Sequence, residues 1–86
     1  MTVEVTVLTQ SSCGFCNQAK DVLVRLGQEF PMRLRTLSLE SEEGRILGER
    51  LGVLYAPGIL FDGELVAFGR PSERRLRREF ARRLSA

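Results

Sequence analysis

The 86-residue sequence predicts an α/β fold, a four-stranded mixed sheet with helices on both faces, in the order β-α-β-α-β-β-α. Three observations predict this fold. Residues 2–39 read as strand, helix and strand, an order typical of two parallel strands joined by a crossover helix. Asp62-Gly63 separates two short apolar runs and predicts an antiparallel hairpin. Apolar residues spaced four apart near the C-terminus predict a last helix.

The first half of the chain predicts two strands and the helix between them. Valines alternate with polar residues over residues 2–8, a pattern typical of a half-buried strand. The helix after Cys13 is expected to end at Leu26, with Gly27 in a left-handed conformation that closes it. Residues 32–39 alternate again and predict the second strand.

A second, shorter helix is predicted in the middle of the chain. Ser41 precedes two glutamates and is expected to cap a helix that ends at Gly52. Gly44 and Gly48 fall inside it, where each costs up to about 1 kcal/mol relative to alanine. The apolar residues expected to point inward are Ile46, Leu47 and Leu51.

The last part of the chain predicts a hairpin followed by a helix. The hairpin strands are expected at residues 59–61 and 65–68. Ser72 is expected to cap the last helix. The apolar residues of this helix recur every four positions, at Leu76, Phe80 and Leu84.

The composition argues against several classes of function. The chain has no histidine, the commonest metal ligand and general base, which argues against a zinc hydrolase or a Cys-His protease. The sequence shows no run of about 18 apolar residues and no signal-peptide pattern. Its length suits one domain that covers residues 1–86. We therefore expect a single-domain cytoplasmic protein without a membrane partner.

Basic residues gather at the C-terminal end. Residues 70–86 contain seven arginines and two glutamates, a net charge of +5, whereas the rest of the chain has a net charge of −3. The arginines are expected to lie on a solvated outer face of the last helix. A basic face can also contact phosphates, but no stacking aromatic residues are interleaved with it, so nucleic acid is the less favoured partner.

Both cysteines of the chain, Cys13 and Cys16, lie where the first strand is expected to pass into the first helix. The N–H groups of a helix start favour the thiolate form of a cysteine, whose free pKa is about 8.5. One helical turn separates the two residues, so they are close enough to form a disulfide. This pattern predicts a redox centre. Because zinc prefers four ligands, the alternative is a dimer that shares a metal or a [2Fe–2S] cluster.

With these features the sequence resembles the compact thioredoxin fold of the glutaredoxins and glutaredoxin-like redoxins. The likeness covers nearly the whole chain. It rests on the motif Cys13-Gly14-Phe15-Cys16, on its position between strand and helix, and on the order of the elements. Tyr55-Ala56-Pro57 before the third strand and Gly69 before the last helix also fall where such proteins have comparable residues.

The resemblance implies a dithiol thiol-disulfide oxidoreductase that reduces protein or low-molecular-weight disulfides. Cys13 would form a mixed disulfide with the substrate, and Cys16 would resolve it. Pro57 would be cis, and the backbone of Ala56 would offer strand-like hydrogen bonds to the substrate.

Two further residues are candidates for substrate binding. Phe15 is either a core residue of the first helix or an exposed aromatic residue that contacts the substrate. Arg70 lies where the family's anionic ligand binds and would hold the carboxylate of a thiol substrate.

The resemblance also implies a set of partners. No resident cofactor or metal is expected, and glutathione or another small thiol would act as co-substrate. The electron donor would be glutathione, another thiol or a reductase, and the protein is expected to be a monomer. In glutaredoxins a basic residue before the first cysteine and a Gly-Gly segment help to hold glutathione. In this chain those places are taken by Gln10-Ser11-Ser12 and by Phe68-Gly69-Arg70-Pro71-Ser72.

Overall fold

The computed structural model describes residues 1–85, so Ala86, the last residue of the predicted domain and of the basic C-terminal stretch, lies outside the described residues. The seven elements follow the predicted order. They are β1 (Val3–Thr9), α1 (Gly14–Leu26), β2 (Met32–Ser38), α2 (Glu42–Leu51), β3 (Gly58–Phe61), β4 (Glu64–Phe68) and α3 (Glu73–Leu84).

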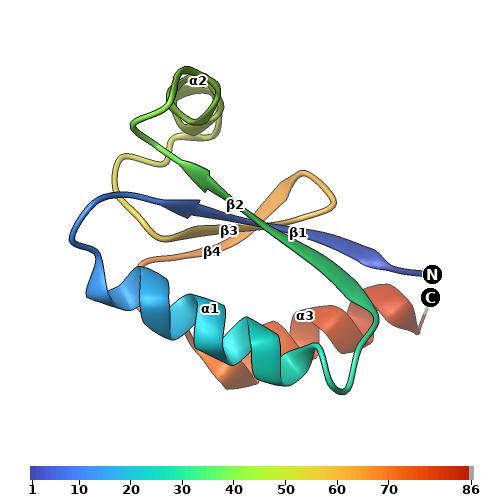
Figure 1. Ribbon diagram of the computed structural model, residues 1–86. Coiled ribbons are helices and arrows are strands. Elements are labelled where there is room, and N and C mark those ends of the chain that lie inside the picture. The colour runs from blue at the N-terminus through green and yellow to red at the C-terminus, as the bar shows by residue number, and fades with distance from the viewer. Residues whose placement is uncertain (86) are drawn as a thin grey trace.

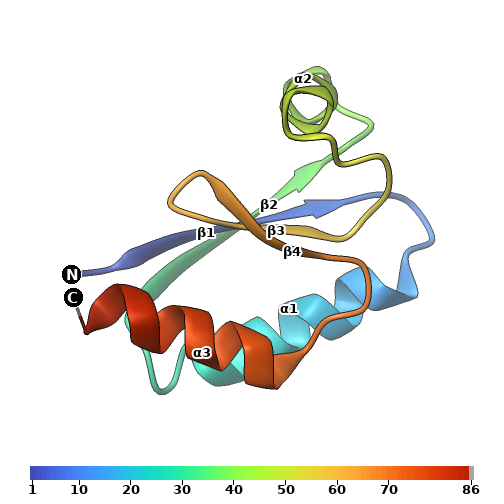
Figure 2. The same ribbon diagram turned by 180° about the vertical axis from the view of Figure 1, so that it is seen from behind.

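The strands form one mixed sheet in the order β2-β1-β3-β4. β1 and β2 are parallel, and β3 is antiparallel to both β1 and β4, as the strand-helix-strand pattern and the hairpin predict. Asp62 and Gly63 both have positive φ, which is the conformation expected of this hairpin turn. Figures 1 and 2 show α1 and α3 on one face of the sheet and α2 on the other. The mixed α/β fold is thereby confirmed.

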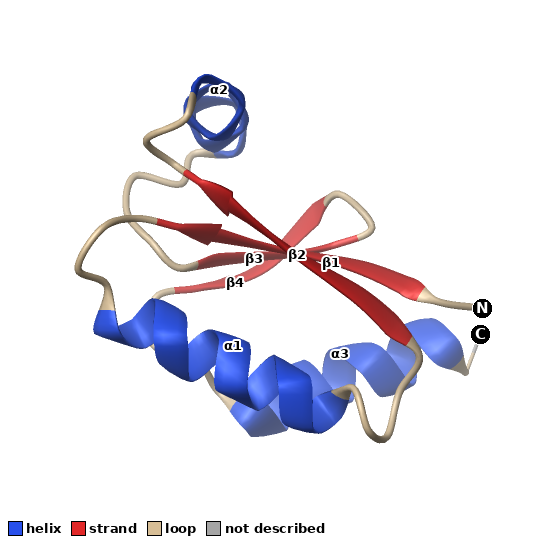
Figure 3. Cartoon of the chain, viewed as in Figure 1, coloured by secondary structure: helices blue, strands red, loops and turns tan. Residues whose placement is uncertain are grey.

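The main core lies between the sheet and the α1–α3 layer. Because side chains alternate along a strand, Val3, Val5 and Val7 of β1 all face this layer. Phe80 of α3 packs at its centre, with its ring 5.2 Å from that of Phe30 and 4.4 Å from that of Phe61. Figure 3 shows the two helices side by side beneath the strands.

A smaller core lies under α2, on the opposite face. Leu8 points to this side, since it follows Val7 along β1, and it packs with Val53 and Leu60. Leu47 and Leu51 of α2 cover this cluster and are partly buried.

The expectation that Ile46 points inward is wrong, because its side chain is 45% exposed. The buried residues of α2 are Gly44 and Gly48. A Cβ at Gly44 would lie 1.8 Å from the carbonyl oxygen of Ser38. The glycines therefore let the helix approach the end of β2 closely, and the apolar stripe of α2 is rotated away from Ile46.

The glycines that follow α1 and α2 adopt different conformations. Gly52 has φ 74°, so α2 ends as predicted. The prediction for Gly27 is wrong, since its φ is −64°. The right-handed winding continues past α1 because the N–H groups of Gln28, Glu29 and Phe30 still donate to carbonyls of the helix.

α3 begins where the sequence predicts, since the side chain of Ser72 accepts a hydrogen bond from the N–H of Arg75. Leu76 and Phe80 are buried. The expectation that the arginines lie on a solvated face is wrong for Arg83. Its side chain is only 15% exposed because it folds back over the sheet, where it bonds Glu64 of β4.

Candidate functional site

Three loops meet at the end of the sheet opposite the two chain termini (Figure 1). β1 and β4 end there and β3 begins there, because Leu8 and Phe68 both pair with Gly58. The loops are residues 10–13, residues 52–57 and residues 69–72. This end of the sheet therefore brings together the cysteines, the Ala56-Pro57 segment and Arg70's loop, which are far apart in the sequence.

Cys13 and Cys16 form a disulfide at the start of α1, with a distance of 5.3 Å between their Cα atoms. Cys13 is the N-cap residue in an extended conformation, and the N–H of Cys16 donates to its sulfur at 3.1 Å. Cys13 is half-buried, whereas Cys16 is only 3% exposed. Cys13 is therefore the more exposed of the two residues, and its sulfur lies at the positive end of the helix dipole.

The loop before Cys13 is fastened on both sides. The N–H and the hydroxyl of Ser11 both donate to one carboxylate oxygen of Glu40, at 3.2 Å and 2.8 Å. On the other side, the N–H of Ala56 donates to the side-chain carbonyl of Gln10 at 3.1 Å. Ser12 has φ 54°, a left-handed conformation that is uncommon for residues other than glycine.

Ala56 and Pro57 are both buried, and the peptide bond between them is cis. The carbonyl of Pro57 accepts a hydrogen bond from the N–H of Gly69 at 2.8 Å, so the loop before β3 is tied to the loop after β4. Gly69 has φ 79°, which suits glycine.

Phe15 is 45% exposed, so it is not a core residue of α1, and its contact with the substrate stays a prediction. Arg70 is also exposed. It lines a cleft of about 260 Å³ with Ser72, Arg75 and side chains of β4. A different, larger cleft lies beside Gln10 and Ser11, so Arg70 and the loop before Cys13 border separate hollows.

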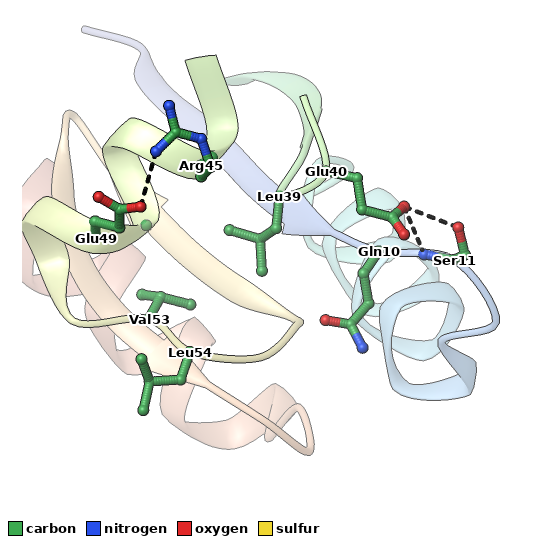
Figure 4. Close-up of a pocket in the computed structure, with 9 residues that line it drawn as sticks. Gln10, Ser11, Leu39, Glu40, Arg45, Glu49, Val53 and Leu54 are labelled. Atoms are coloured by element: carbon green, nitrogen blue, oxygen red, sulfur yellow. Dashed lines mark hydrogen bonds and ion pairs between the residues drawn. The ribbon is translucent and has the colours of Figure 1, made fainter. Parts of the chain in front are cut away.

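Figure 4 shows the larger cleft, which measures about 390 Å³ and lies between the loop before Cys13 and α2. Gln10 and Ser11 line one side. Arg45 and Glu49 of α2 line the other and form an ion pair at 2.9 Å. Leu54, which is 89% exposed, lies at its border.

Sequence reasoning missed an aromatic pair at this end of the molecule. Tyr55 and Phe68 are 52% and 57% exposed, and their rings meet edge to face with centroids 5.8 Å apart. The available signal was position, since Tyr55 precedes Ala56-Pro57 and Phe68 precedes Gly69. The contacts of Gln10 and Glu40 were also missed, because no local sequence pattern indicates them.

The carboxyl groups with clearly shifted pKa values lie on α3 or near the C-terminal end of α1. A hydrogen bond from Arg77 lowers the pKa of Glu29, and one from Arg82 lowers the pKa of Glu79. Among residues 1–85, no group of three or more cysteine and acidic side chains could hold a metal ion. A cluster shared between two chains needs a second copy and stays a prediction. No helix in the described part of the chain is long and apolar enough to cross a membrane.

Three solved structures share the fold over most of the chain. A mutant thioredoxin from Halobacterium salinarum is 21% identical, with a TM-score of 0.70, and the match covers 93% of this chain and 73% of that one. A malarial protein is 18% identical, with a TM-score of 0.65 and coverage of 88% and 90%. Glutaredoxin 1 from Francisella tularensis, complexed with cacodylate, is 14% identical, with a TM-score of 0.55 and coverage of 98% and 99%.

These likenesses establish the thioredoxin-like fold. No curated protein matches the chain significantly. A family model does match, that of glutaredoxin, over residues 5–66. The matched segment includes the Cys13–Cys16 disulfide and the cis bond before Pro57, and it spans most of the chain. The chain therefore belongs to the glutaredoxin family, a family of redox proteins with a CxxC cysteine pair.

Proposed function

We propose that this protein is a dithiol oxidoreductase that reduces disulfides of proteins or small thiols through a mixed disulfide at Cys13, which Cys16 resolves. The observation that supports it best is the position of Cys13. Its sulfur caps α1 and accepts the N–H of Cys16, and Cys13 is more exposed than Cys16. Backbone N–H donors at a helix start stabilise a thiolate, which is the form that attacks disulfides.

In the first step, the thiolate of reduced Cys13 attacks one sulfur of the substrate disulfide. A sulfur–sulfur bond forms between Cys13 and the substrate, and the substrate's own bond breaks. The leaving substrate thiolate takes a proton from solvent. No electrons have left the protein–substrate pair, because one disulfide has been exchanged for another.

In the second step, Cys16 loses its proton to solvent and its thiolate attacks the sulfur of Cys13. The Cys13–Cys16 disulfide forms, and the second substrate thiol is released after it takes up a proton. Two electrons have passed from the dithiol to the substrate. The 5.3 Å between the two Cα atoms fits this closure, since disulfide-bonded cysteines have Cα atoms about 4.4 to 6.8 Å apart.

Substrate binding is assigned to the residues around the pair. The backbone of Ala56, beside Pro57, would hydrogen-bond an extended substrate, and the exposed ring of Phe15 would contact it. Arg70 would bind the carboxylate of a small thiol such as glutathione. Both sulfurs belong to one chain, so we expect the reaction to need only a monomer and a single domain. The electron donor would be a small thiol or a reductase.

Serine variants test the assignment of roles. We expect Cys13→Ser to abolish disulfide reduction, because the attacking sulfur is gone. We expect Cys16→Ser to react once and to remain joined to the substrate, because nothing resolves the mixed disulfide. Mass spectrometry after incubation with a peptide disulfide distinguishes the two outcomes.

The wild-type protein should also reduce the peptide disulfide in repeated turnovers, with either glutathione and its reductase or thioredoxin reductase as electron donor. Comparison of the two donors identifies the preferred one. If Cys13→Ser kept full activity, or if the substrate were trapped on Cys16 instead, the proposed roles would be wrong.

A further inference from the structure

We propose that Gln10 determines substrate specificity. Its side-chain carbonyl accepts a hydrogen bond from the backbone N–H of Ala56, and on binding a backbone carbonyl of a polypeptide disulfide replaces the Gln10 carbonyl as acceptor. The inference deepens the proposed function and rests on it. Gln10 is expected to affect the reduction of disulfides flanked by main chain but not the reduction of disulfides that have no peptide groups.

Gln10 lies opposite Ala56 in the continuation of the β1–β3 pairing. The pairs from Val5↔Phe61 to Leu8↔Gly58 keep one antiparallel register, and the same register continued by two residues brings Gln10 to Ala56. The ladder cannot continue through Pro57, which has no N–H. The N–H of Ala56 donates instead to Oε1 of Gln10 at 3.1 Å. A side chain therefore takes the place that a strand carbonyl would have.

The N–H of Ala56 needs a hydrogen-bond acceptor, but another acceptor can replace Gln10. Ala56 is only 8% exposed, and a buried N–H group requires a hydrogen-bond partner. The partner, Gln10, is an exposed residue on a loop and can turn away without disturbing the core. The carbonyl of Ala56 accepts no hydrogen bond from residues 1–85. One residue with a free carbonyl and an N–H held by a surface side chain is equivalent to a short strand edge, which an extended peptide can pair with.

The surroundings of Ala56 also fit a polypeptide. On one side, the exposed rings of Tyr55 and Phe68 offer apolar contacts to side chains next to the substrate cysteine. On the other, the loop that leads to Cys13 contains no charged residue. The charged side chains that line the cleft beside Gln10 are already bonded, Glu40 to Ser11 and Arg45 to Glu49, so competition from Gln10 for the one N–H should be measurable.

The test compares two disulfides. Reduced protein is mixed with an oligopeptide disulfide, whose cysteines have main chain on both sides, or with 2-hydroxyethyl disulfide, which has no peptide group. The rate constant of the first exchange is measured for each, and the ratio of the two constants is compared between variants. The ratio cancels any change in the reactivity of Cys13 itself.

We expect Gln10→Ala to raise the peptide-to-hydroxyethyl ratio by roughly two- to tenfold, the worth of one net hydrogen bond. Gln10→Glu keeps an acceptor and strengthens it with a charge, so it should lower the ratio. Ser11→Ala is the matched control, since it removes the hydroxyl bond to Glu40 in the same loop but leaves Ala56 untouched; its ratio should equal that of the wild type.

The outcomes separate this inference from the proposed function. A wild-type protein that exchanges with neither disulfide would overturn both. An active wild type whose ratio is unchanged or lower in Gln10→Ala would overturn the inference alone, as would a shift in the same direction for Gln10→Ala and Gln10→Glu. Should Gln10→Ala fail to fold, the lowered ratio in Gln10→Glu, which keeps the hydrogen bond, still decides.

Discussion

Cys13 and Cys16 have the same side chain, and their surroundings make them different. Cys13 precedes the first turn of α1, so its sulfur can accept a backbone N–H. Cys16 lies inside that turn, where its sulfur is covered by the core side of the helix. A shift of one turn along the sequence thus separates a half-buried cysteine from a buried one, which is the asymmetry that an attacking and a resolving cysteine require.

A substitution of Arg70 tests its proposed role in substrate binding. If it holds the carboxylate of a small thiol, Arg70→Ala should raise the KM for glutathione disulfide by about two- to fivefold, the worth of an exposed charge pair. Arg74→Ala is the matched control, because Arg74 is an exposed arginine of the same stretch, placed inside α3. Steady-state kinetics of both variants check the prediction. Equal effects of the two substitutions would show that only general positive charge matters.

Sequence reasoning found the residues of this site that belong to a local pattern. Neighbouring residues mark the cysteine pair, whereas the Ala56-Pro57 segment was assigned from the resemblance to the glutaredoxins. The bond between Gln10 and Ala56 joins residues 46 positions apart, and the bond between Ser11 and Glu40 joins residues 29 apart. Polar side chains in a loop bond according to what the fold brings near, so neither contact was predictable from spacing.

Among the elements, α2 shows most clearly how packing overrides propensity. Its two internal glycines lower helix propensity, yet they are the residues that it buries. From the sequence alone, Gly44 and Gly48 only lower the helix propensity of this segment. In the structure they lie where the helix packs closely beside the end of β2. Ile46 was expected inward by periodicity, and the close contact at the glycines rotates it outward.

Gly44→Ala tests this packing. Its Cβ would overlap a backbone oxygen of Ser38, which cannot move as freely as a side chain. We expect the free energy of unfolding to fall by about 1 to 3 kcal/mol, typical of an overpacked site. Gly14→Ala is the control, because nothing lies within 4 Å of a Cβ there, and it should be neutral or slightly stabilising. Denaturant unfolding measures both; a Gly44→Ala protein as stable as the control would show that α2 is not held this closely.

At the scale of the whole molecule, charges on α3 tie the last helix to the hairpin. Arg83 bonds Glu64 of β4, approaches Glu79 at 3.4 Å and lies 5.9 Å from the centre of the Phe61 ring. The contacts with Glu64 and Phe61 join the end of α3 to β4 and β3. The basic stretch is therefore partly a structural device, and its arginines are not all available to an external partner.

The stabilisation that Glu79 contributes within α3 depends on pH. Hydrogen bonds from Arg82 and Arg83 lower its pKa in the folded protein. A lowered folded pKa means that the stabilisation is complete above the unfolded pKa, about 4.3, and is lost as the pH falls through the folded value. The melting temperature of Glu79→Gln should therefore lie below that of the wild type at neutral pH, and the difference should shrink in acid.

Asp21→Asn is the control for that series, because Asp21 is exposed and forms no ion pair with residues 1–85. Its difference from the wild type should stay small at every pH. A Glu79→Gln difference that persisted unchanged below the folded pKa would show that the side chain acts by packing and not by charge.

The fold as a whole was predictable, since strand and helix periods, the Asp62-Gly63 turn and the caps Ser41 and Ser72 all favour one order of elements. That order also determines where the site lies, because β1 and β4 end, and β3 begins, at one end of the sheet (Figure 1). The clefts were not predictable, since their walls combine loop residues with side chains of α2, or of β4 and α3, that come together only in the folded chain.

The most direct measurement of the central claim is the rate of alkylation of each cysteine in the reduced protein at about pH 6, where an ordinary thiol is almost entirely protonated. Iodoacetamide labelling followed by peptide mass spectrometry gives both rates in one sample. We expect Cys13 to react many times faster than Cys16, since Cys13 is the more exposed residue and its sulfur is held as a thiolate by the start of α1. Slow labelling of both cysteines at similar rates would contradict this expectation.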